Sequence, residues 1–354
     1  MKRILLIAFT TFVTLAAVEA QEVKNIIFLI GDGMGLASAS MMQLENNYEP
    51  TIFDSADNIA LQKTYSLDNR VTDSAASGTA LASGHKTNNT MLGMLPDGTH
   101  TESLMEVAAK HNKATGIVVT TYLQHATPGA FYAHVASRHE YTTISEQLLA
   151  SDIDIAIGGG MAFFEERYDG RNNALNAIHT SGYTLIEDIN DECDSDRIIA
   201  LLAPKEIESR TGYLATATTK AIEHLDRVDD ENGFVLMVEG SLIDGMGHGN
   251  NAVGQQAEMR DFMEAVEVAV AYAAKRDDTL VVVTADHGTG GLTIISGNAD
   301  FNLSEQGVEY HWATTGHSGE LVPIYLYGTG TELINGIMEN SELGAMLKEI
   351  VATR

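Results

Sequence analysis

Short apolar runs alternate with amphipathic segments along most of the chain. Runs rich in Val, Ile and Leu, each bounded by glycine or polar residues, predict buried parallel strands. They cover residues 24–30, 115–121, 153–157, 233–238, 279–284 and 322–327. Between them, apolar residues recur every three or four positions, which predicts helices. These segments cover residues 102–111, 141–149, 212–228 and 255–274.

The alternation of strands and helices predicts the fold class. We expect an α/β fold with three layers, in which a mainly parallel central sheet carries helices on both faces. The segment 255–274 has the clearest helical stripe, formed by Met259, Phe262, Val266 and Val270. The chain has no internal repeat and no obvious linker, so we expect one domain over residues 21–354. Ligands of such sheets bind at the carboxyl ends of the strands.

The N-terminal segment has the features of a targeting sequence. Lys2 and Arg3 precede a mostly apolar stretch over residues 4–18, and a small-x-small ending reaches Ala20. This pattern predicts a signal peptide over residues 1–20 and secretion to the periplasm or the medium. An N-terminal membrane anchor is the alternative.

The charge of the chain restricts its partners. It carries 49 acidic against 21 basic residues, a formal net charge of −28. This charge disfavours nucleic acids and anionic membranes as partners. A site for phosphate would need local positive charge, which bound metal ions could supply. Cys193 is the only cysteine, so the chain can form no intrachain disulfide.

Acidic and imidazole side chains stand at the ends of several predicted strands. Asp32 lies in a glycine-rich turn after the first strand, Glu239 ends the run that starts at Gly233, and Asp286 and His287 follow another run. Asp32 could instead cap the following helix. The turn is not a dinucleotide motif, because Leu36 occupies the position of the third glycine.

A second group of ligand-type residues lies further along the chain. Asp244 and His248 are four residues apart, and the three glycines interleaved with them favour a loop. His317 lies in a glycine-rich loop before the last predicted strand. Carboxylate oxygens and imidazole nitrogens are suitable zinc ligands. Each residue alone could be an ordinary loop residue, but together at neighbouring strand ends they indicate a metal centre.

One serine is the candidate nucleophile. Ser74 follows Asp73 and is flanked by small residues. A serine hydroxyl is a poor nucleophile at neutral pH, and metal coordination is one way to activate it. By contrast, Thr127 and Arg138 are unremarkable in isolation.

Taken together and in this order, these motifs resemble an alkaline phosphatase of the compact bacterial type. The resemblance covers nearly the whole chain after residue 20. It rests on separate motifs, namely the strand-Asp32 element, Asp73-Ser74-Ala75, His125-Ala126-Thr127-Pro128, Ser137-Arg138, Val238-Glu239-Gly240, Asp244 with His248, Thr284-Ala285-Asp286-His287, and His317.

The resemblance implies a phosphomonoesterase that acts on small-molecule phosphate monoesters and forms a homodimer. Ser74 would become phosphorylated, Arg138 would bind two phosphate oxygens, and Asp73 would orient the arginine. The resemblance also implies two Zn²⁺ and one Mg²⁺ per chain. The ligands would be Asp244, His248 and His317 for the first zinc, Asp32, Asp286 and His287 for the second, and Asp32, Thr127 and Glu239 for magnesium.

Two positions depart from some relatives in the family. His125 stands where some members have an aspartate that holds magnesium-bound water. Gly245 stands where others have Lys, Trp or His near the phosphate. We therefore expect weak retention of magnesium and altered retention of phosphate.

The sequence leaves other functions open. A phosphodiesterase or a phosphoglycerate mutase-like enzyme would share the two-metal core, but Arg138, Thr127 and Glu239 favour a phosphomonoesterase. A sulfatase is disfavoured by the residues around Ser74. A secreted protein that only binds metal or phosphate would have no need of the Ser74 hydroxyl.

Overall fold

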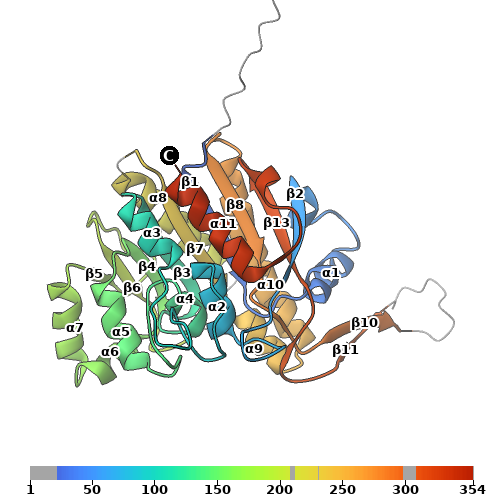
Figure 1. The fold of residues 1–354 in the computed structure, drawn as a ribbon, viewed down its shortest axis with the longest axis horizontal. Coiled ribbons are helices and arrows are strands. Elements are labelled where there is room, and N and C mark those ends of the chain that lie inside the picture. Colours follow the sequence, from blue (N-terminus) through green and yellow to red (C-terminus); the bar gives the residue numbers. More distant parts are fainter. Residues whose placement is uncertain (1–21, 208–211, 230, 298–307, 354) are drawn as a thin grey trace, which may run out of the picture.

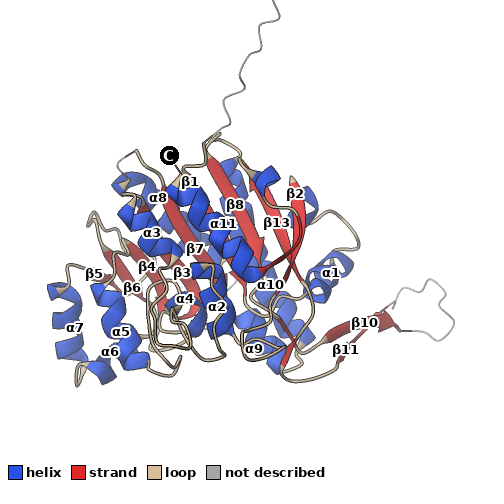
Figure 2. Cartoon of the chain, in the orientation of Figure 1, coloured by secondary structure: helices blue, strands red, loops and turns tan. Residues whose placement is uncertain are grey.

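The computed structural model describes residues 22–207, 212–229, 231–297 and 308–353, so the predicted signal peptide lies outside the described residues. Within the described residues, the centre is a ten-stranded sheet with helices on both sides (Figures 1 and 2). The spatial order of its strands is β14 (Gly336–Glu339), β2 (Asn58–Lys63), β13 (Val322–Gly328), β8 (Thr279–Thr284), β1 (Asn25–Gly31), β7 (Phe234–Gly240), β3 (Ala114–Tyr122), β4 (Ile155–Gly159), β6 (Ile198–Leu201) and β5 (Thr184–Ile186).

Two buried cores cover the two faces of the sheet. Side chains alternate along β1, so Phe28 and Ile30 join one core while Ile27 and Leu29 join the other. The helices that contribute to the first core include α2 (Ser74–Ser83), α3 (Leu104–Lys110), α5 (Tyr141–Ala150), α6 (Met161–Arg167), α7 (Arg171–Thr180) and α11 (Asn340–Ala352). Those of the second include α1 (Leu36–Glu45), α8 (Tyr213–Val228) and α10 (Ala252–Ala273). The predicted three-layer α/β class is confirmed.

One strand runs against the predicted direction. β13 is antiparallel to both of its neighbours, β8 and β2, so the prediction of a parallel strand over residues 322–327 is wrong. The described residues between β8 and β13 form strands and loops but no helix. An antiparallel neighbour can be reached without the helical crossover that a parallel neighbour requires.

Local sequence signals explain where several helices begin. α10 starts at Ala252, earlier than its apolar stripe predicts, because Asn251 caps it by accepting the backbone N–H of Gly254. α3 starts with a capping box in which the Ser103 hydroxyl and the Glu106 carboxylate each accept a backbone N–H of the other residue.

The segment with the three interleaved glycines is also helical. α9 (Leu242–His248) directly follows β7, so the prediction of a loop there is wrong. Glycine disfavours a helix by about 1 kcal/mol relative to alanine. At Gly247 the missing side chain has a packing role, because a Cβ atom there would lie 3.0 Å from the Cβ of Thr289. Close packing therefore accounts for one of the residues that made the segment resemble a loop.

Smaller elements complete the edge that contains the candidate site. They are α4 (Ala126–Gly129), the paired strands β9 (Gly288–Thr289) and β12 (His317–Ser318), and the hairpin of β10 (Leu292–Ser296) and β11 (Val308–Trp312). The hairpin projects from the body of the molecule (Figure 1). Short 3₁₀ helices cover Ile52–Ser55 and Thr331–Leu333. In the described part of the chain, no helix has both the length and the apolar character needed to cross a bilayer.

Candidate active site

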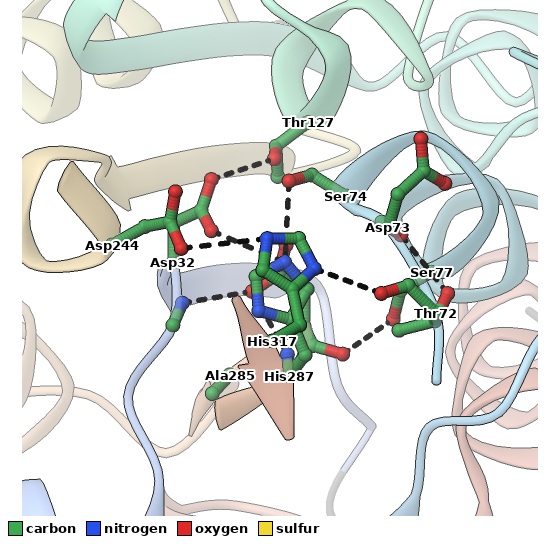
Figure 3. A network of polar contacts seen from close by, with 12 residues as sticks. Asp32, Thr72, Asp73, Ser74, Ser77, Thr127, Asp244, Ala285, His287 and His317 are labelled. Atoms are coloured by element: carbon green, nitrogen blue, oxygen red, sulfur yellow. Dashed lines mark hydrogen bonds and ion pairs between the residues drawn. The ribbon is translucent and has the colours of Figure 1, made fainter. Parts of the chain in front are cut away.

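The predicted site residues gather at the carboxyl ends of four adjacent strands, β8, β1, β7 and β3. Asp32 follows β1, Glu239 is the next-to-last residue of β7, and Asp286 and His287 follow β8. Thr127 lies in α4, just after β3. Because neighbouring parallel strands end at the same edge, side chains from distant parts of the sequence meet there (Figure 3).

Ser74 is the first residue of α2 and is nearly buried, with 2% of its surface exposed. Its Oγ atom lies 3.2 Å from Nε2 of His287 (Figure 3). One turn later, the Ser77 hydroxyl donates to the backbone carbonyl of Asp286 at 2.7 Å. This bond fixes α2 against the end of β8, so it holds the hydroxyl of Ser74 beside the imidazole.

Asp73 links the start of α2 to Arg138. Its Oδ1 atom accepts the backbone N–H of Ala76 and caps the helix. Its Oδ2 atom lies 3.2 Å from Nη1 of Arg138 and also accepts the backbone N–H of Thr90. The Nη2 atom of Arg138 donates to Nε2 of His125 at 3.1 Å. The guanidinium is thus held from two sides.

Asp244, His248 and His317 form the first group of ligand-type side chains. Nε2 of His248 lies 3.2 Å from Oδ2 of Asp244 and 3.3 Å from Nε2 of His317. Asp244 and His248 are one turn apart on α9, so their side chains share a face. The other ring nitrogens contact backbone carbonyls, His248 that of Thr315 at 2.6 Å and His317 that of Thr72 at 2.8 Å. Such outer contacts orient metal-binding imidazoles.

Asp32, Asp286 and His287 form a second group, which is fully buried. Nε2 of His287 lies 3.1 Å from Oδ2 of Asp286 and 3.5 Å from Oδ1 of Asp32. One potential ligand atom from each of the three residues lies within 4.8 Å of the others. This spacing would allow the three side chains to hold one ion.

A third group adjoins the second through Asp32. The hydroxyl of Thr127 lies 3.4 Å from Oδ2 of Asp32, and the Ser241 hydroxyl donates to Oε2 of Glu239 at 2.7 Å. Ligand atoms of Asp32, Glu239 and His125 also lie within 4.8 Å of one another. The third group is therefore rich in oxygen atoms, with one imidazole at its border.

Buried atoms without partners show that these groups suit cations. Among the described residues, Asp32 Oδ1, Asp286 Oδ2 and Glu239 Oε1 are buried and lack a hydrogen-bond partner. Unpartnered carboxylate oxygens are costly to bury, and a bound cation would remove that cost. The residues present therefore fit divalent metal ions.

The same burial perturbs the acids when no cation is bound. Burial, reinforced by Asp286, Asp244 and Glu239, raises the pKa of Asp32 well above its usual range. Burial also raises the pKa of Glu239 to about 8. A nearby cation favours the charged form of a carboxylate and opposes this effect. These acids would thus bind metal with release of protons.

Sequence reasoning missed several residues that shape the site. Thr289 contacts both Asp244 and His287, and the backbone carbonyls of Thr72 and Thr315 contact two imidazoles. Thr289 could have been identified only from its position two residues after His287, because side chains two residues apart in an extended segment point to the same face. The carbonyls carry no sequence signal.

Comparison with known proteins places this chain within a class of metal-binding hydrolases. The family model for alkaline phosphatase matches residues 23–309. The chain belongs to the alkaline phosphatase family and is an enzyme of that kind, which hydrolyses phosphate monoesters.

Similar proteins include bacterial alkaline phosphatases. Alkaline phosphatase 3 of Bacillus subtilis (strain 168) is 32% identical, and the match covers 91% of this chain and 87% of that protein. The alkaline phosphatase of Escherichia coli (strain K12) is 33% identical over 75% of this chain and 70% of that protein.

Solved structures also match closely. The alkaline phosphatase of the Antarctic bacterium TAB5 is 34% identical, with a TM-score of 0.88 over 95% of this chain and 100% of that chain. A variant of that enzyme, in which a histidine is replaced by glutamate, has Mg bound in its M3 site and matches with a TM-score of 0.87 at 33% identity.

Proposed function

We propose that the enzyme acts through a covalent phosphoserine on Ser74 and uses two Zn²⁺ and one Mg²⁺ per chain. The observation that carries this proposal is the position of the Ser74 hydroxyl, 3.2 Å from Nε2 of His287. A nearly buried hydroxyl beside a ligand-type nitrogen matches the requirement for a metal-activated nucleophile.

The ligand groups suggest how the three cations are distributed. His287 lies close enough to Asp244 and His317 to join the first group, but its Nε2 atom contacts Asp286 and Asp32. We therefore assign it to the second. Imidazole and carboxylate ligands suit zinc, and an oxygen-only set suits magnesium. The proposed ligands are Asp244, His248 and His317 for the first zinc, Asp32, Asp286 and His287 for the second, and Asp32, Thr127 and Glu239 for magnesium.

The residues of the chain have distinct roles in the proposed reaction. Bound zinc ions would lower the pKa of the serine hydroxyl and neutralise charge on the attacking and leaving oxygens. The Oγ atom of Ser74 forms a bond to phosphorus while the ester P–O bond breaks, and the alcohol leaves with a proton. Ser74 then regains its hydroxyl proton when water cleaves the phosphoserine and releases inorganic phosphate.

Arg138 would select the phosphate monoester. Its planar guanidinium can donate two N–H groups to two non-bridging oxygens of the phosphate. Asp73 accepts from Nη1 and so limits the rotation of the guanidinium. A diester offers fewer terminal oxygens and less charge, and its second substituent occupies space near the arginine.

Two residues would tune the site in this chain. His125 borders the third ligand group and accepts from Arg138 through Nε2, so its neutral ring carries no negative charge toward a magnesium ion. A variant of the Antarctic enzyme with glutamate in place of a histidine has Mg bound in its M3 site, and a carboxylate at position 125 would likewise add a negative charge for magnesium. A side chain at Gly245 would meet nothing within 4 Å at its Cβ, so the chain lacks a phosphate contact there although space is present.

We also propose that the enzyme is secreted and forms a homodimer. The N-terminal pattern supports cleavage after Ala20, and the family resemblance supports the dimer. N-terminal sequencing of protein recovered from the periplasm or the medium should start at Gln21. Sedimentation equilibrium of the purified protein should give twice the mass of the mature chain.

Trapping of the covalent intermediate tests the proposed function. The enzyme should be mixed with a chromogenic phosphate monoester, quenched in acid and digested for mass spectrometry. Phosphate should appear on the Ser74 peptide. Ser74→Ala should abolish the label and leave only a residual rate from binding and positioning. Ser83→Ala, which removes a hydroxyl from the same helix, should keep label and rate. Phosphate on another residue would refute the assignment.

A further inference from the structure

Thr289 lies between the first and the second ligand groups and contacts a member of each. Its Oγ1 atom lies 2.5 Å from Oδ1 of Asp244 and 3.2 Å from Nδ1 of His287. The residue belongs to β9 and is buried, with 2% of its surface exposed. One hydroxyl thus joins a carboxylate assigned to the first zinc to an imidazole assigned to the second.

Counting donors and acceptors fixes the direction of both hydrogen bonds. A hydroxyl has one hydrogen to donate, and an ionised carboxylate can only accept. Thr289 therefore donates to Asp244 and must accept a proton-bearing Nδ1 of His287. In the neutral ring that can bind a metal ion, a proton on Nδ1 leaves Nε2 of His287 available as a ligand atom where it faces Asp286, Asp32 and the Ser74 hydroxyl. Metal-binding imidazoles commonly have their second nitrogen oriented in this way.

The backbone around Thr289 is shaped to bring it close. Its N–H donates to the carbonyl of Gly33 at 3.2 Å, one residue from Asp32. A Cβ atom on Gly33 would lie 2.8 Å from Oγ1 of Thr289, and a Cβ on Gly247 would lie 3.0 Å from Cβ of Thr289. Gly33 also has a φ of +75°, which favours glycine. Thr289 therefore touches the turn after β1, helix α9 and His287 at one point.

We propose that Thr289 is a positioning residue that couples the two zinc sites. The inference rests on the zinc assignments in the proposed function. An ion bound by the first group fixes the carboxylate of Asp244, which fixes the hydroxyl of Thr289 and with it the tautomer of His287. The second ion then binds a ring that is already oriented. Because coupling between sites is reciprocal, occupation of the second group favours the first to the same extent.

Zinc titration of metal-free protein tests this proposal without relying on activity. Isothermal titration calorimetry, with a competing chelator of known affinity, would give the two stepwise zinc affinities of each variant. Thr289→Val keeps the shape of the side chain but has no hydroxyl. Both zinc affinities should fall by about 10- to 100-fold, as is typical when an outer-shell partner is removed. Thr289→Ser keeps the hydroxyl, so both of its zinc affinities should lie within about threefold of those of the wild type. That difference is small compared with the loss expected when an outer-shell partner is removed.

A matched control separates this role from general packing. Thr218 is a buried threonine on α8 whose hydroxyl has no hydrogen-bond partner, so Thr218→Val should leave both zinc affinities unchanged. Circular dichroism should show that each variant is folded. Thr289→Ala, which also lacks the hydroxyl and is smaller, replaces the valine variant if that protein does not fold.

The possible failures can be told apart. If the wild type binds two zinc ions and Thr289→Val binds them with unchanged affinities, the coupling role is wrong while the proposed function stands. If Thr289→Ser is as weak as Thr289→Val, the methyl group rather than the hydroxyl is responsible, which also overturns the inference. If the wild type binds fewer than two zinc ions, the proposed function fails and the coupling fails with it.

Discussion

The Oδ2 atom of Asp73 lies 3.2 Å from Nη1 of Arg138, while Oδ1 of the same residue caps the helix that begins with Ser74. Each of the two paired side chains is only 17% exposed, so water screens the pair weakly. Asp73 therefore fixes the guanidinium relative to the proposed nucleophile. This relationship makes the arginine the natural first target for mutation.

Arg138→Ala should impair hydrolysis of monoesters much more than hydrolysis of diesters. The loss of charge-assisted hydrogen bonds worth about 1.5–4 kcal/mol in total corresponds to roughly a 10- to 1000-fold fall in kcat/KM. The slower hydrolysis of a diester should change little, because a diester uses the guanidinium less. The measurement is the ratio of the two kcat/KM values before and after substitution.

The control for Arg138 is an arginine outside the site. Arg167 pairs with Glu146 at the surface, where both side chains are well exposed, so Arg167→Ala should alter neither rate. If Arg138→Ala reduced monoester and diester hydrolysis equally, the arginine would act through folding or metal binding and not through contact with phosphate.

Removal of bound metal should abolish activity and lower thermal stability. Ions that bind only the folded state stabilise it by about 2.7 kcal/mol when free metal exceeds Kd a hundredfold. In their absence, burial raises the pKa values of Asp32 and Glu239, and the folded state no longer gains the binding energy of the ions in this cluster. Differential scanning calorimetry with and without chelator should show a lower Tm, and added zinc and magnesium should restore both properties. A chelated protein free of metal by elemental analysis and still fully active would contradict the metal requirement.

The sequence predicted the fold class and the location of the site because both depend on local patterns. Buried strands are short apolar runs, and Asp32, Glu239, Asp286 and His287 directly follow or end such runs. Once the strands lie side by side, these residues must meet at one edge. The alternation of strands and helices was therefore sufficient to place them.

Other features could not be predicted because they depend on contacts distant in sequence. The chain passes from β8 to β13 through residues that form no helix in the described part, which allows the antiparallel direction of β13. The apolar run of β13 would look the same in a parallel strand, so it gives no signal for the direction. The glycine at position 247 of α9 leaves room for Thr289, which packs against it from a distant part of the sequence. Backbone carbonyls such as that of Thr315, which contacts His248, leave no trace in residue identity.

An ion pair away from the site should give stability a defined pH dependence. Nε2 of His134 lies 3.1 Å from Oε1 of Glu106, whose other oxygen accepts the N–H of Ser103 in the capping box. The bond to Glu106 raises the pKa of His134 above 6.5. Burial acts to raise the pKa of Glu106, but its bonds to His134 and Ser103 outweigh burial and hold the pKa below 4.5.

The signs of the two shifts define the pH window. A raised histidine pKa gives stability that is complete below 6.5 and is lost as the pH rises through the folded value. A lowered glutamate pKa gives stability that is present above 4.5 and is lost as the pH falls through the folded value. The contribution of the pair should therefore be greatest between pH 4.5 and 6.5.

Glu106→Gln tests this window, because glutamine retains the capping box and lacks the charge. In chelated protein, the Tm of the wild type should exceed that of the variant by about 1–3 °C within the window. The expected difference is small because Glu106 is 38% exposed. As the pH rises above the window, the difference in Tm should shrink. Glu102→Gln is the control, because Glu102 pairs with Lys110, which stays charged at neutral pH. The difference in Tm between the wild type and this variant should not shrink near neutral pH. A Glu106→Gln difference that stayed constant up to pH 9 would exclude His134 as the partner.

His125→Asp should convert weak retention of magnesium into tight retention. His125 is neutral, because burial and the adjacent Arg138 lower its pKa to about 3, and its Nε2 atom accepts from Arg138. The ring therefore brings no negative charge to the group that contains Asp32 and Glu239. An aspartate would add a charge and acceptors for the hydrogens of magnesium-bound water, and it would keep a partner for Arg138.

Equilibrium dialysis followed by elemental analysis measures this effect. The wild type should lose most of its magnesium on long dialysis and gain activity when magnesium is added. The His125→Asp protein should retain about one magnesium per chain, because its oxygen ligands provide a single site. Its activity should change little when magnesium is added. His139 is an exposed histidine outside the ligand groups, so His139→Asp adds the same charge to the surface and should behave like the wild type. Magnesium that survived long dialysis of the wild type would show that the imidazole of His125 does not weaken the site.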